Sequence, residues 1–378
     1  MTYARARVFT GMISIGWWVL LCILALFLDA SGEIARYEGE SRSAAILLVF
    51  VLGYIVLGLP FDVLGGYVLP RKFERPAESF SQWFAKWSRG VLLHGALLWS
   101  FGMIIMSVAD WFGVVAAIAT VGVIMLFQAR FQLWLGQLLS PMKLAYTSTV
   151  GNGEVEDLGH LRFAVLETEE QNFTGGIVGR PGKETIVLPA QWQKMLKPEL
   201  MEIVTAGRLG AIMSGSRNRG LVFAIVWNLI GFALATMLSP HALASAAGVI
   251  DVALIFSLFT FVGMFGILPF FSRRGTLEVD SWTREQGLCP FELQRVMSFH
   301  NKQRDDNATR PTFLEFFCHP IPSVENRLQN LLLEEEPKGA WHVARQSLFL
   351  SWAGLSLLSR SAHCNLGRPE LWVILPCD

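Results

Sequence analysis

Long apolar blocks separated by short polar segments restrict the fold of this chain more than any other feature. A helix needs about 20 mostly apolar residues to cross the hydrocarbon core of a bilayer. Charged residues make up only 16% of the 378 residues, whereas about a quarter is usual in soluble proteins. The sequence therefore predicts a mainly α, polytopic membrane protein with about six transmembrane helices. The six blocks are residues 9–30, 44–69, 91–109, 112–127, 221–238 and 242–271.

Two blocks are irregular at their ends. The fourth is short and is followed closely by Gln128 and Arg130. The second contains Pro60 and Asp62, so we expect its spanning part to end near Leu59, because proline interrupts helices and charge is costly in lipid. The first block lacks a small-residue cleavage site, and we therefore expect it to be retained rather than removed as a signal peptide.

The basic residues favour one orientation. Lysines and arginines gather in the N-terminal flank and in alternate polar segments, as the positive-inside bias requires. This pattern predicts that both termini are cytoplasmic, and we expect a multi-pass protein of the bacterial cytoplasmic membrane. The formal net charge of zero gives no electrostatic argument for a nucleic-acid partner. The residues concerned are Arg5, Arg7, Arg71, Lys72, Arg75, Lys86, Arg89, Arg217, Arg219, Arg273 and Arg274.

The polar regions divide the chain into four parts: helices in 1–139, a first polar region 140–220, a membrane hairpin 221–271 and a second polar region 272–378. In the first polar region, residues 161–167 and 184–189 have the apolar pattern of strands, and they flank a turn-rich segment. A helix should begin at Pro198, since the fixed φ of proline suits a first helical turn. The second region is expected to be mainly helical. We expect both to lie in the cytoplasm as a small α+β unit.

Three short motifs occur in an informative order. AGRLGA occupies residues 206–211 before the hairpin, and SRRGTLEVD (272–280) and HPIPSVENRL (319–328) follow it. This order resembles that of the integral-membrane zinc metallopeptidases of the CAAX-prenyl-protease and HtpX type. In that family, A-H-E-L-G-H precedes the hairpin and S-R-x-x-E-x-x-A-D follows it. Two histidines four residues apart hold zinc on one helix face, and the intervening glutamate acts as the general base.

The resemblance implies that the zinc site of this chain is degenerate. Gly207 and Ala211 stand in place of the two histidines, Arg208 in place of the catalytic glutamate, and Thr276 in place of the third ligand. A fixed cation repels Zn²⁺. We therefore expect no metal, no cofactor and no peptidase activity.

The leading functional hypothesis is a catalytically inactive homologue that acts as a scaffold or accessory subunit of a membrane protein complex in the lipid bilayer. Its candidate pocket or partner-binding residues on the former active side are Arg208, Asp280, His319 and Arg327. The resemblance also implies that an extended polypeptide pairs with a sheet edge beside the former metal. Residues 184–189 are expected to form that edge, with Thr185, Ile186, Val187 and Leu188 at its centre.

Other functions remain open at this point. The vacated pocket could serve as a lipid or peptide site or in zinc-free catalysis, with Cys318, His319, Glu278 or Asp280 as reactive groups. Asp251 lies inside the last apolar block, so it is either a membrane-depth functional carboxylate, as in a transporter, or a residue near the outer interface. A soft-ligand metal site could form if Cys318, His319, His363, Cys364 and Cys377 meet. Arginines 208, 217, 219, 273 and 274 could bind anionic headgroups.

The C-terminal part carries a further apolar segment. Residues 341–360 have basic ends and two tryptophans around an apolar run that is too short to span a bilayer. We expect an interfacial or docking helix there. Residues 369–376, PELWVILP, are expected to be a packed strand or a partner-binding segment.

Overall fold

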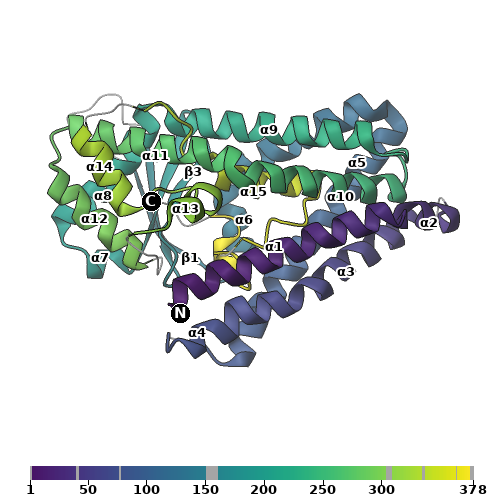
Figure 1. The fold of residues 1–378 in the computed structure, drawn as a ribbon, viewed down its shortest axis with the longest axis horizontal. Coiled ribbons are helices and arrows are strands. Elements are labelled where there is room, and N and C mark those ends of the chain that lie inside the picture. Colours follow the sequence, from purple (N-terminus) through teal and green to yellow (C-terminus); the bar gives the residue numbers. More distant parts are fainter. Residues whose placement is uncertain are drawn as a thin grey trace.

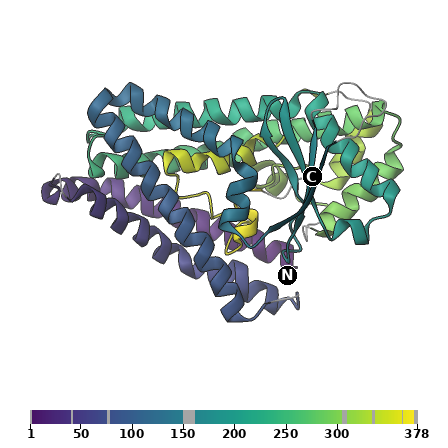
Figure 2. The same ribbon diagram turned by 180° about the vertical axis from the view of Figure 1, so that it is seen from behind.

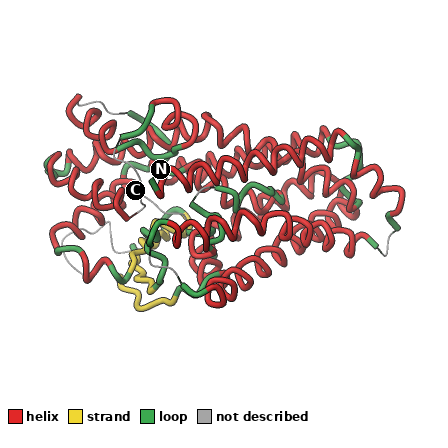
Figure 3. Tube along the Cα trace, turned by 60° about the horizontal axis from the view of Figure 1, so that its bottom comes forward, coloured by secondary structure: helices red, strands yellow, loops and turns green. Residues whose placement is uncertain are grey.

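The computed structural model describes residues 2–39, 42–75, 78–149, 161–303, 309–333, 337–362 and 364–374, with the backbone only at 148, 149 and 318. Five of the helical stretches that it describes are long and apolar enough to cross a membrane. They form an elongated bundle with the small sheet and its helices at one end (Figures 1 and 3). The five are α1 (Tyr3–Phe27), Ser43–Lys72, α5 (Phe80–Arg130), Ser216–Leu238 (α9) and Ala246–Glu285.

The long helix α5 contains two of the expected spans. It is broken at Gly113, whose φ of 83° and ψ of 174° suit glycine almost exclusively. The chain then returns along the bundle. This is shown by the Arg89 side chain, which donates hydrogen bonds to the carbonyls of Gln137 and Leu138, both at 3.1 Å. The halves before and after Gly113 correspond to the third and fourth apolar blocks.

The second span does not end near Leu59 as expected. Helix α3 (Ser43–Val63) continues through Pro60, and a π-helical turn (Leu64–Val68) leads into α4 (Leu69–Lys72). A π turn widens the helix locally and so relieves the strain around an internal proline. The short helix α2 (Ala30–Tyr37) links α1 to α3 at the end of the bundle far from the sheet (Figure 1).

The last span has a similar interruption. Helix α10 (Ala246–Val262) is followed by a π-helical turn (Gly263–Ile267), in which Phe265 and Gly266 leave the helical conformation. Helix α11 (Leu268–Glu285) then carries the SRRGTLEVD motif out of the bundle toward the sheet. The motif is therefore helical, and its side chains at three- and four-residue spacing share one face.

The sheet has four strands in the order β1-β2-β4-β3. Strands β2 (Arg162–Glu167) and β4 (Lys183–Pro189) confirm the two predicted strands, and they pair in parallel with Phe163 opposite Ile186. Strand β4 is not an edge, contrary to expectation, because β3 (Gly176–Arg180) pairs with its other side. The turn-rich composition of 172–183 hid this short strand. The other edge is β1 (Lys143–Thr149), antiparallel to β2.

Helices cover the sheet and form a second core with it. This core includes Val165 and Ile186 of the sheet and Trp192, Ile203 and Met297 of the helices, and it is separate from the core of the membrane bundle. In Figure 2, these helices lie on the side of the sheet that faces away from the bundle. They are α7 (Trp192–Met195), α8 (Pro198–Met213), α12 (Pro290–Gln303) and α14 (Val324–Leu333). Helix α6 (Gln132–Leu139) joins the bundle to β1 and packs in the core of the bundle, and α13 (Thr312–Cys318) packs against α11 and the π-helical turn Gly263–Ile267.

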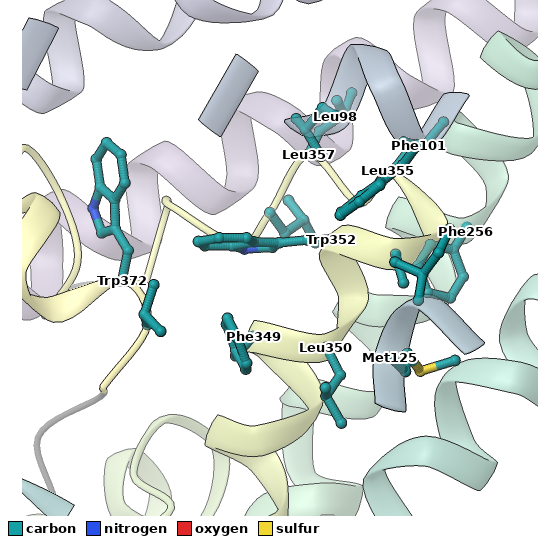
Figure 4. Packing of buried hydrophobic residues seen from close by; sticks show 14 of the residues in the cluster. Leu98, Phe101, Met125, Phe256, Phe349, Leu350, Trp352, Leu355, Leu357 and Trp372 are labelled. Carbon is teal, nitrogen blue, oxygen red and sulfur yellow. The ribbon is translucent and has the colours of Figure 1, made fainter. Parts of the chain in front are cut away.

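The C-terminal segment lies inside the bundle, not on its surface. Helix α15 (Val343–Leu350) packs against α9, and the 3-10 turns Ser351–Gly354 and Pro369–Leu371 pack against α5. Residues 369–371 form a turn, so the expected strand there is absent. The expectation that all of 272–378 belongs to the cytoplasmic unit therefore fails for 343–374, because its apolar residues are buried among the spans (Figure 4).

Candidate functional site

Helix α8 carries the AGRLGA motif and begins at Pro198, as predicted. It has one buried face toward the sheet and the second core, formed by Ile203, Val204, Arg208, Gly210 and Ala211. A helix that packs on a sheet needs an apolar stripe, and here an arginine interrupts that stripe. The side chain of this arginine therefore decides what the site can do.

The Arg208 side chain is turned into the protein and is fully buried. Its guanidinium donates hydrogen bonds to the carbonyl of Val187 in β4 at 2.6 Å and to the carbonyl of Thr174 at 2.5 Å. It also lies over the Trp192 ring, 5.5 Å from the centroid. Charge-assisted hydrogen bonds of this kind are strong, so Arg208 ties α8 to the sheet.

The turn before β3 is shaped around this guanidinium. Gly175 has a φ of +74°, and a Cβ atom there would lie 2.0 Å from the carbonyl oxygen of Val187 and 3.3 Å from the Arg208 guanidinium. Only glycine leaves room for the two carbonyls and Arg208 to meet. Thus Val187, expected as a partner-binding residue, contributes its backbone to an internal contact.

Ala211, at the second histidine position, is completely buried. It packs in one small cluster with Ile177 of β3, Val279 of α11 and Trp341 of the C-terminal segment. The α8 position where the resemblance expects a zinc ligand is therefore enclosed by a small apolar cluster that includes Trp341. This cluster brings together segments that are 130 residues apart in the sequence, and no sequence pattern signals it.

The two glycines of the motif have different surroundings. A Cβ atom at Gly207 would meet nothing within 4 Å, whereas one at Gly210 would lie 2.7 Å from the Trp282 ring of α11. Gly210 is therefore required for the close packing of α8 on α11. Gly207 is not required by packing.

Thr276 is buried on α11, the helix that packs against α8. Its hydroxyl donates a hydrogen bond of 3.3 Å to the Ser272 carbonyl one turn earlier. The Ser272 hydroxyl in turn accepts a hydrogen bond from the Ala344 amide at 3.0 Å. Thr276, at the position of the expected third ligand, is thus hydrogen-bonded to Ser272, the residue that also binds the C-terminal segment.

Asp280 and Arg327, both expected near the site, bind each other. The Arg327 Nε and Nη2 atoms lie 2.8 and 2.6 Å from the two carboxylate oxygens of Asp280. Both side chains are buried, so this bidentate pair links α11 to α14. Its hydrogen bonding fits a structural link better than a reactive carboxylate.

The other arginines of the expected basic patch contact protein groups. The Arg273 guanidinium donates to the carbonyls of Glu315, Phe316 and His319 at the end of α13, at 3.0, 2.8 and 3.1 Å. His319 is therefore placed at a helix end, where its backbone is held by α11. Of the rest, Arg217 pairs with Glu184, Arg219 with Glu278, and Arg274 donates to the Lys338 carbonyl.

Asp251 is far from this region. It lies early in α10, where it accepts hydrogen bonds from the hydroxyls of Ser31 and Ser239. Ser31 belongs to α2, at the end of the bundle opposite α8 (Figure 1). The carboxylate is thus bound by hydroxyls near the end of a helix, which favours the interface interpretation over a site at mid-membrane depth.

The proposed soft-ligand cluster lies partly outside the described residues. His363, Cys377 and the side chain of Cys318 are not described. The Cys364 thiol donates to the Asn365 side chain at 3.2 Å. Among the side chains that are described, no group of three or more histidine, cysteine or carboxylate residues could hold a metal ion.

Sequence reasoning missed a polar cluster inside the bundle. The Asp62 carboxylate accepts hydrogen bonds from the Trp87 indole at 2.9 Å, from Arg360 at 3.2 Å and from the Gly367 amide at 2.9 Å. The Arg360 Nε donates to the Tyr54 hydroxyl at 3.0 Å. The presence of Asp62 in an apolar block could have signalled this site, as Asp251 did for its own block. Its partner Arg360, however, lies almost 300 residues away in the sequence.

A cleft at the sheet end of the bundle contains the second missed feature. Its lining includes Glu78, Lys86, Glu170 and Glu370. Burial, and then the neighbouring Glu170 carboxylate, raise the pKa of Glu370 to about 7. Lys86 forms ion pairs of 2.6 Å with Glu78 and Glu169. The buried Glu370 therefore titrates near neutral pH, where carboxylates are normally charged.

Known proteins resemble this chain in two ways. Residues 2–142 match the family model described as CAAX prenyl protease N-terminal, five membrane helices. The fold is similar to that in the crystal structure of Ste24p from S. mikatae, with a TM-score of 0.64 and 14% identity over 84% of this chain and 80% of that chain. At this identity, the likeness shows the fold alone. No curated protein matches the sequence.

Proposed function

The N-terminal membrane part of this chain belongs to the CAAX prenyl protease family of membrane metallopeptidases, and on that premise we propose that the chain is a catalytically inactive member. Its role is that of a scaffold or accessory subunit of a membrane protein complex. It binds no zinc, and it lies in the bacterial cytoplasmic membrane with both termini on the cytoplasmic side.

The direction of the Arg208 side chain is the observation that carries this proposal. A guanidinium is charged at any physiological pH, and here two backbone carbonyls hold it on α8 at the place of the catalytic glutamate. It cannot act as a general base, and its charge disfavours a nearby Zn²⁺.

The neighbouring positions do not fit a zinc site either. Zinc in proteins takes cysteine, histidine or carboxylate ligands, usually three or four of them. Gly207 and Ala211 have no donor atom in their side chains, and the Thr276 hydroxyl donates to a backbone carbonyl. Reuse of the pocket for an anionic ligand is also less well supported, because the Arg208 guanidinium already has carbonyl partners.

A scaffold needs an accessible surface for its partner. Strand β1 is the edge of the sheet that could accept an additional strand, and its side chains from Lys143 to Thr147 are exposed. Leu144 and Tyr146 are apolar side chains on this edge. In contrast, β4 is internal and the residues Gly176, Ile177 and Val178 of β3 are buried. We therefore place the partner-binding edge at β1 rather than at residues 184–189.

Purification in a mild detergent tests the proposal. We expect no stoichiometric zinc by elemental analysis and one membrane protein that co-purifies in a fixed ratio. Gly207→Leu should leave that ratio unchanged, because nothing lies within 4 Å of an added Cβ. Leu144→Lys on the exposed edge should lower it several-fold.

Gly210→Leu is the matched control, because an added Cβ there would contact Trp282 and should reduce the yield of folded protein. One zinc per chain that is lost on Thr276→Ala would contradict the inactive assignment. A well-folded Gly207→Leu protein that loses its partner would favour a ligand in the former active site.

A further inference from the structure

The C-terminal segment, residues 339–374, is enclosed by the rest of the molecule. Of its described residues, all are buried except Arg345, Gln346, Ala362 and Cys364, which are part-exposed. The segment lies between α5, α9 and α10 in the centre of the bundle (Figures 1 and 2). It therefore occupies the space that the membrane-spanning helices surround.

Its apolar side chains fill this space. Trp352 packs against Phe349 and lies 4.4 Å from the His94 ring of α5, measured between ring centroids. Figure 4 shows Trp352, Leu355 and Leu357 among Leu98, Phe101 and Phe256 of the surrounding helices. These contacts come from side chains alone and would suit many apolar polypeptides.

A polar contact makes the fit specific. Asp62 is buried in α3, and Arg360 is the cation that pairs with it, at 3.2 Å. The Gly367 amide donates to the other carboxylate oxygen at 2.9 Å. A buried carboxylate without a partner is strongly unfavourable, so the interior of the bundle selects a segment with a guanidinium at this place.

Close backbone contacts also restrict the shape of a segment that can fit inside the bundle. A Cβ atom at Gly66 would lie 2.3 Å from the Gly367 carbonyl oxygen, and one at Gly367 would lie 2.1 Å from the Asp62 carbonyl oxygen. At the other end of the segment, Cβ atoms at Gly220 and Gly275 would each lie 2.3 Å from the Trp341 backbone. The walls thus have glycines where the segment approaches most closely.

The same segment reaches the α8 region. The Trp341 amide donates to the Ser216 carbonyl at 3.1 Å, and Trp341 belongs to the same small apolar cluster as Ala211 and Ile177. One continuous stretch of chain therefore covers the buried α8 face at one end and fills the membrane interior at the other.

We propose that the membrane bundle contains a binding site for an apolar, arginine-bearing polypeptide segment, and that residues 339–374 occupy this site as an internal plug. The plug closes both the bundle interior and the α8 face to any second polypeptide. The inference rests on the proposed function only in treating α8 as the former zinc helix. Partners of the protein must then bind to its outer surfaces.

A nicked full-length protein can test the plug. A protease recognition sequence placed at Lys338, which is exposed, allows the folded chain to be cut after purification. Cys22 is the native probe, since it is buried in α1 near Ser257, whose hydroxyl accepts a hydrogen bond from the Leu357 amide. The other cysteines are replaced by serine. Cys22 is then labelled with a water-soluble maleimide in increasing denaturant.

We expect the cut fragment to remain bound without denaturant and Cys22 to stay protected. Fragment release and Cys22 labelling should then rise together, at a lower denaturant concentration than loss of the helical signal of the bundle. Arg360→Met should raise the labelling rate at least tenfold at a fixed concentration below the midpoint. Arg345→Met, in the part-exposed stretch of the same segment, should leave it unchanged.

Two results would overturn the plug. Cys22 labelling that appears only when the helical signal is lost would make the segment an integral part of the folded core. Equal labelling in the Arg360 and Arg345 variants would remove the proposed selectivity of Asp62. Neither result depends on zinc or on partner binding, so failure of the plug can be distinguished from failure of the proposed function.

Discussion

Arg208 makes a structural contact at the position where the family resemblance expects the catalytic glutamate. Its charge is compensated by the carbonyls of Val187 and Thr174 and by the Trp192 ring. A guanidinium has five N–H donors, and two of the partners of Arg208 are these backbone carbonyl oxygens. The cost of burying this cation is therefore reduced while α8 is fixed to the sheet. From the residue type alone we expect only that a general base is missing at this position, whereas the hydrogen-bond partners show that Arg208 links α8 to the sheet.

Glu370 is expected to make stability depend on pH. Its folded-state pKa is about 7, whereas the ordinary value is near 4.5. The folded protein therefore keeps a proton that the unfolded chain has released, and stability falls as pH rises through about 7. Two and a half pKa units correspond to about 3 kcal/mol.

Thermal unfolding in detergent between about pH 5 and pH 8 measures this effect. The melting temperature should decrease with pH in the natural protein, and Glu370→Gln should remove most of the decrease. An unchanged pH profile in the Gln variant would show that Glu370 is not the group responsible.

At the scale of elements, π-helical turns adapt two of the spanning helices to their neighbours. The turn Leu64–Val68 presents Gly65 and Gly66 to the C-terminal segment. The turn Gly263–Ile267 lets α11 leave the axis of α10 and reach α8. Such turns often occur where a helix must make room for a specific contact.

The close contact at Gly66 can be compared with an open position in the same span. Gly66→Ala should destabilise the protein by about 1–3 kcal/mol, the usual range for overpacking, because the added Cβ would meet backbone 2.3 Å away. Gly53→Ala in α3 meets nothing within 4 Å and should be neutral or gain up to about 1 kcal/mol from helix propensity. The melting temperatures of both variants, measured in the same detergent and compared with that of the natural protein, test this prediction. Similar melting temperatures would mean that the segment shifts away easily.

For the whole molecule, the two ends of the bundle differ in composition. The sheet and its helices lie at the end that holds the N-terminus, and α2 lies at the other end (Figure 1). The arginines that flank the hairpin, such as Arg219 and Arg274, also lie at the sheet end, where they contact residues 338 and 339. The positive-inside bias therefore predicts that the sheet lies in the cytoplasm.

Single-cysteine labelling checks this orientation. In a background without native cysteines, Gln286→Cys should react with a membrane-impermeant reagent only after the cells are opened. Tyr37, the last residue of α2, is highly exposed, so Tyr37→Cys should react in intact cells. Reaction of position 286 from outside would reverse the proposed topology.

The sequence by itself determined the features that depend on local pattern. The lengths of the apolar blocks predicted the membrane-spanning helices. The apolar pattern of residues 161–167 and 184–189 predicted β2 and β4, and Pro198 predicted the start of α8. That Gly207 and Ala211 have no donor atom in their side chains also follows directly from the sequence, whereas the loss of a zinc site there stays a prediction. These properties are set by residues within one or two helical turns or along one strand, so neighbouring residues suffice.

Only the tertiary structure decided which distant segments meet. Strand β3 displaced β4 from the sheet edge, Arg208 turned to Val187, and Arg360 paired with Asp62 across almost 300 residues. The apolar composition of 341–360 is compatible with a membrane surface and with a bundle interior, since both exclude water. The segment lies in the bundle interior because the surrounding helices have glycines where it approaches them and because the buried Asp62 carboxylate pairs with Arg360. Both features belong to other parts of the chain and not to the segment itself.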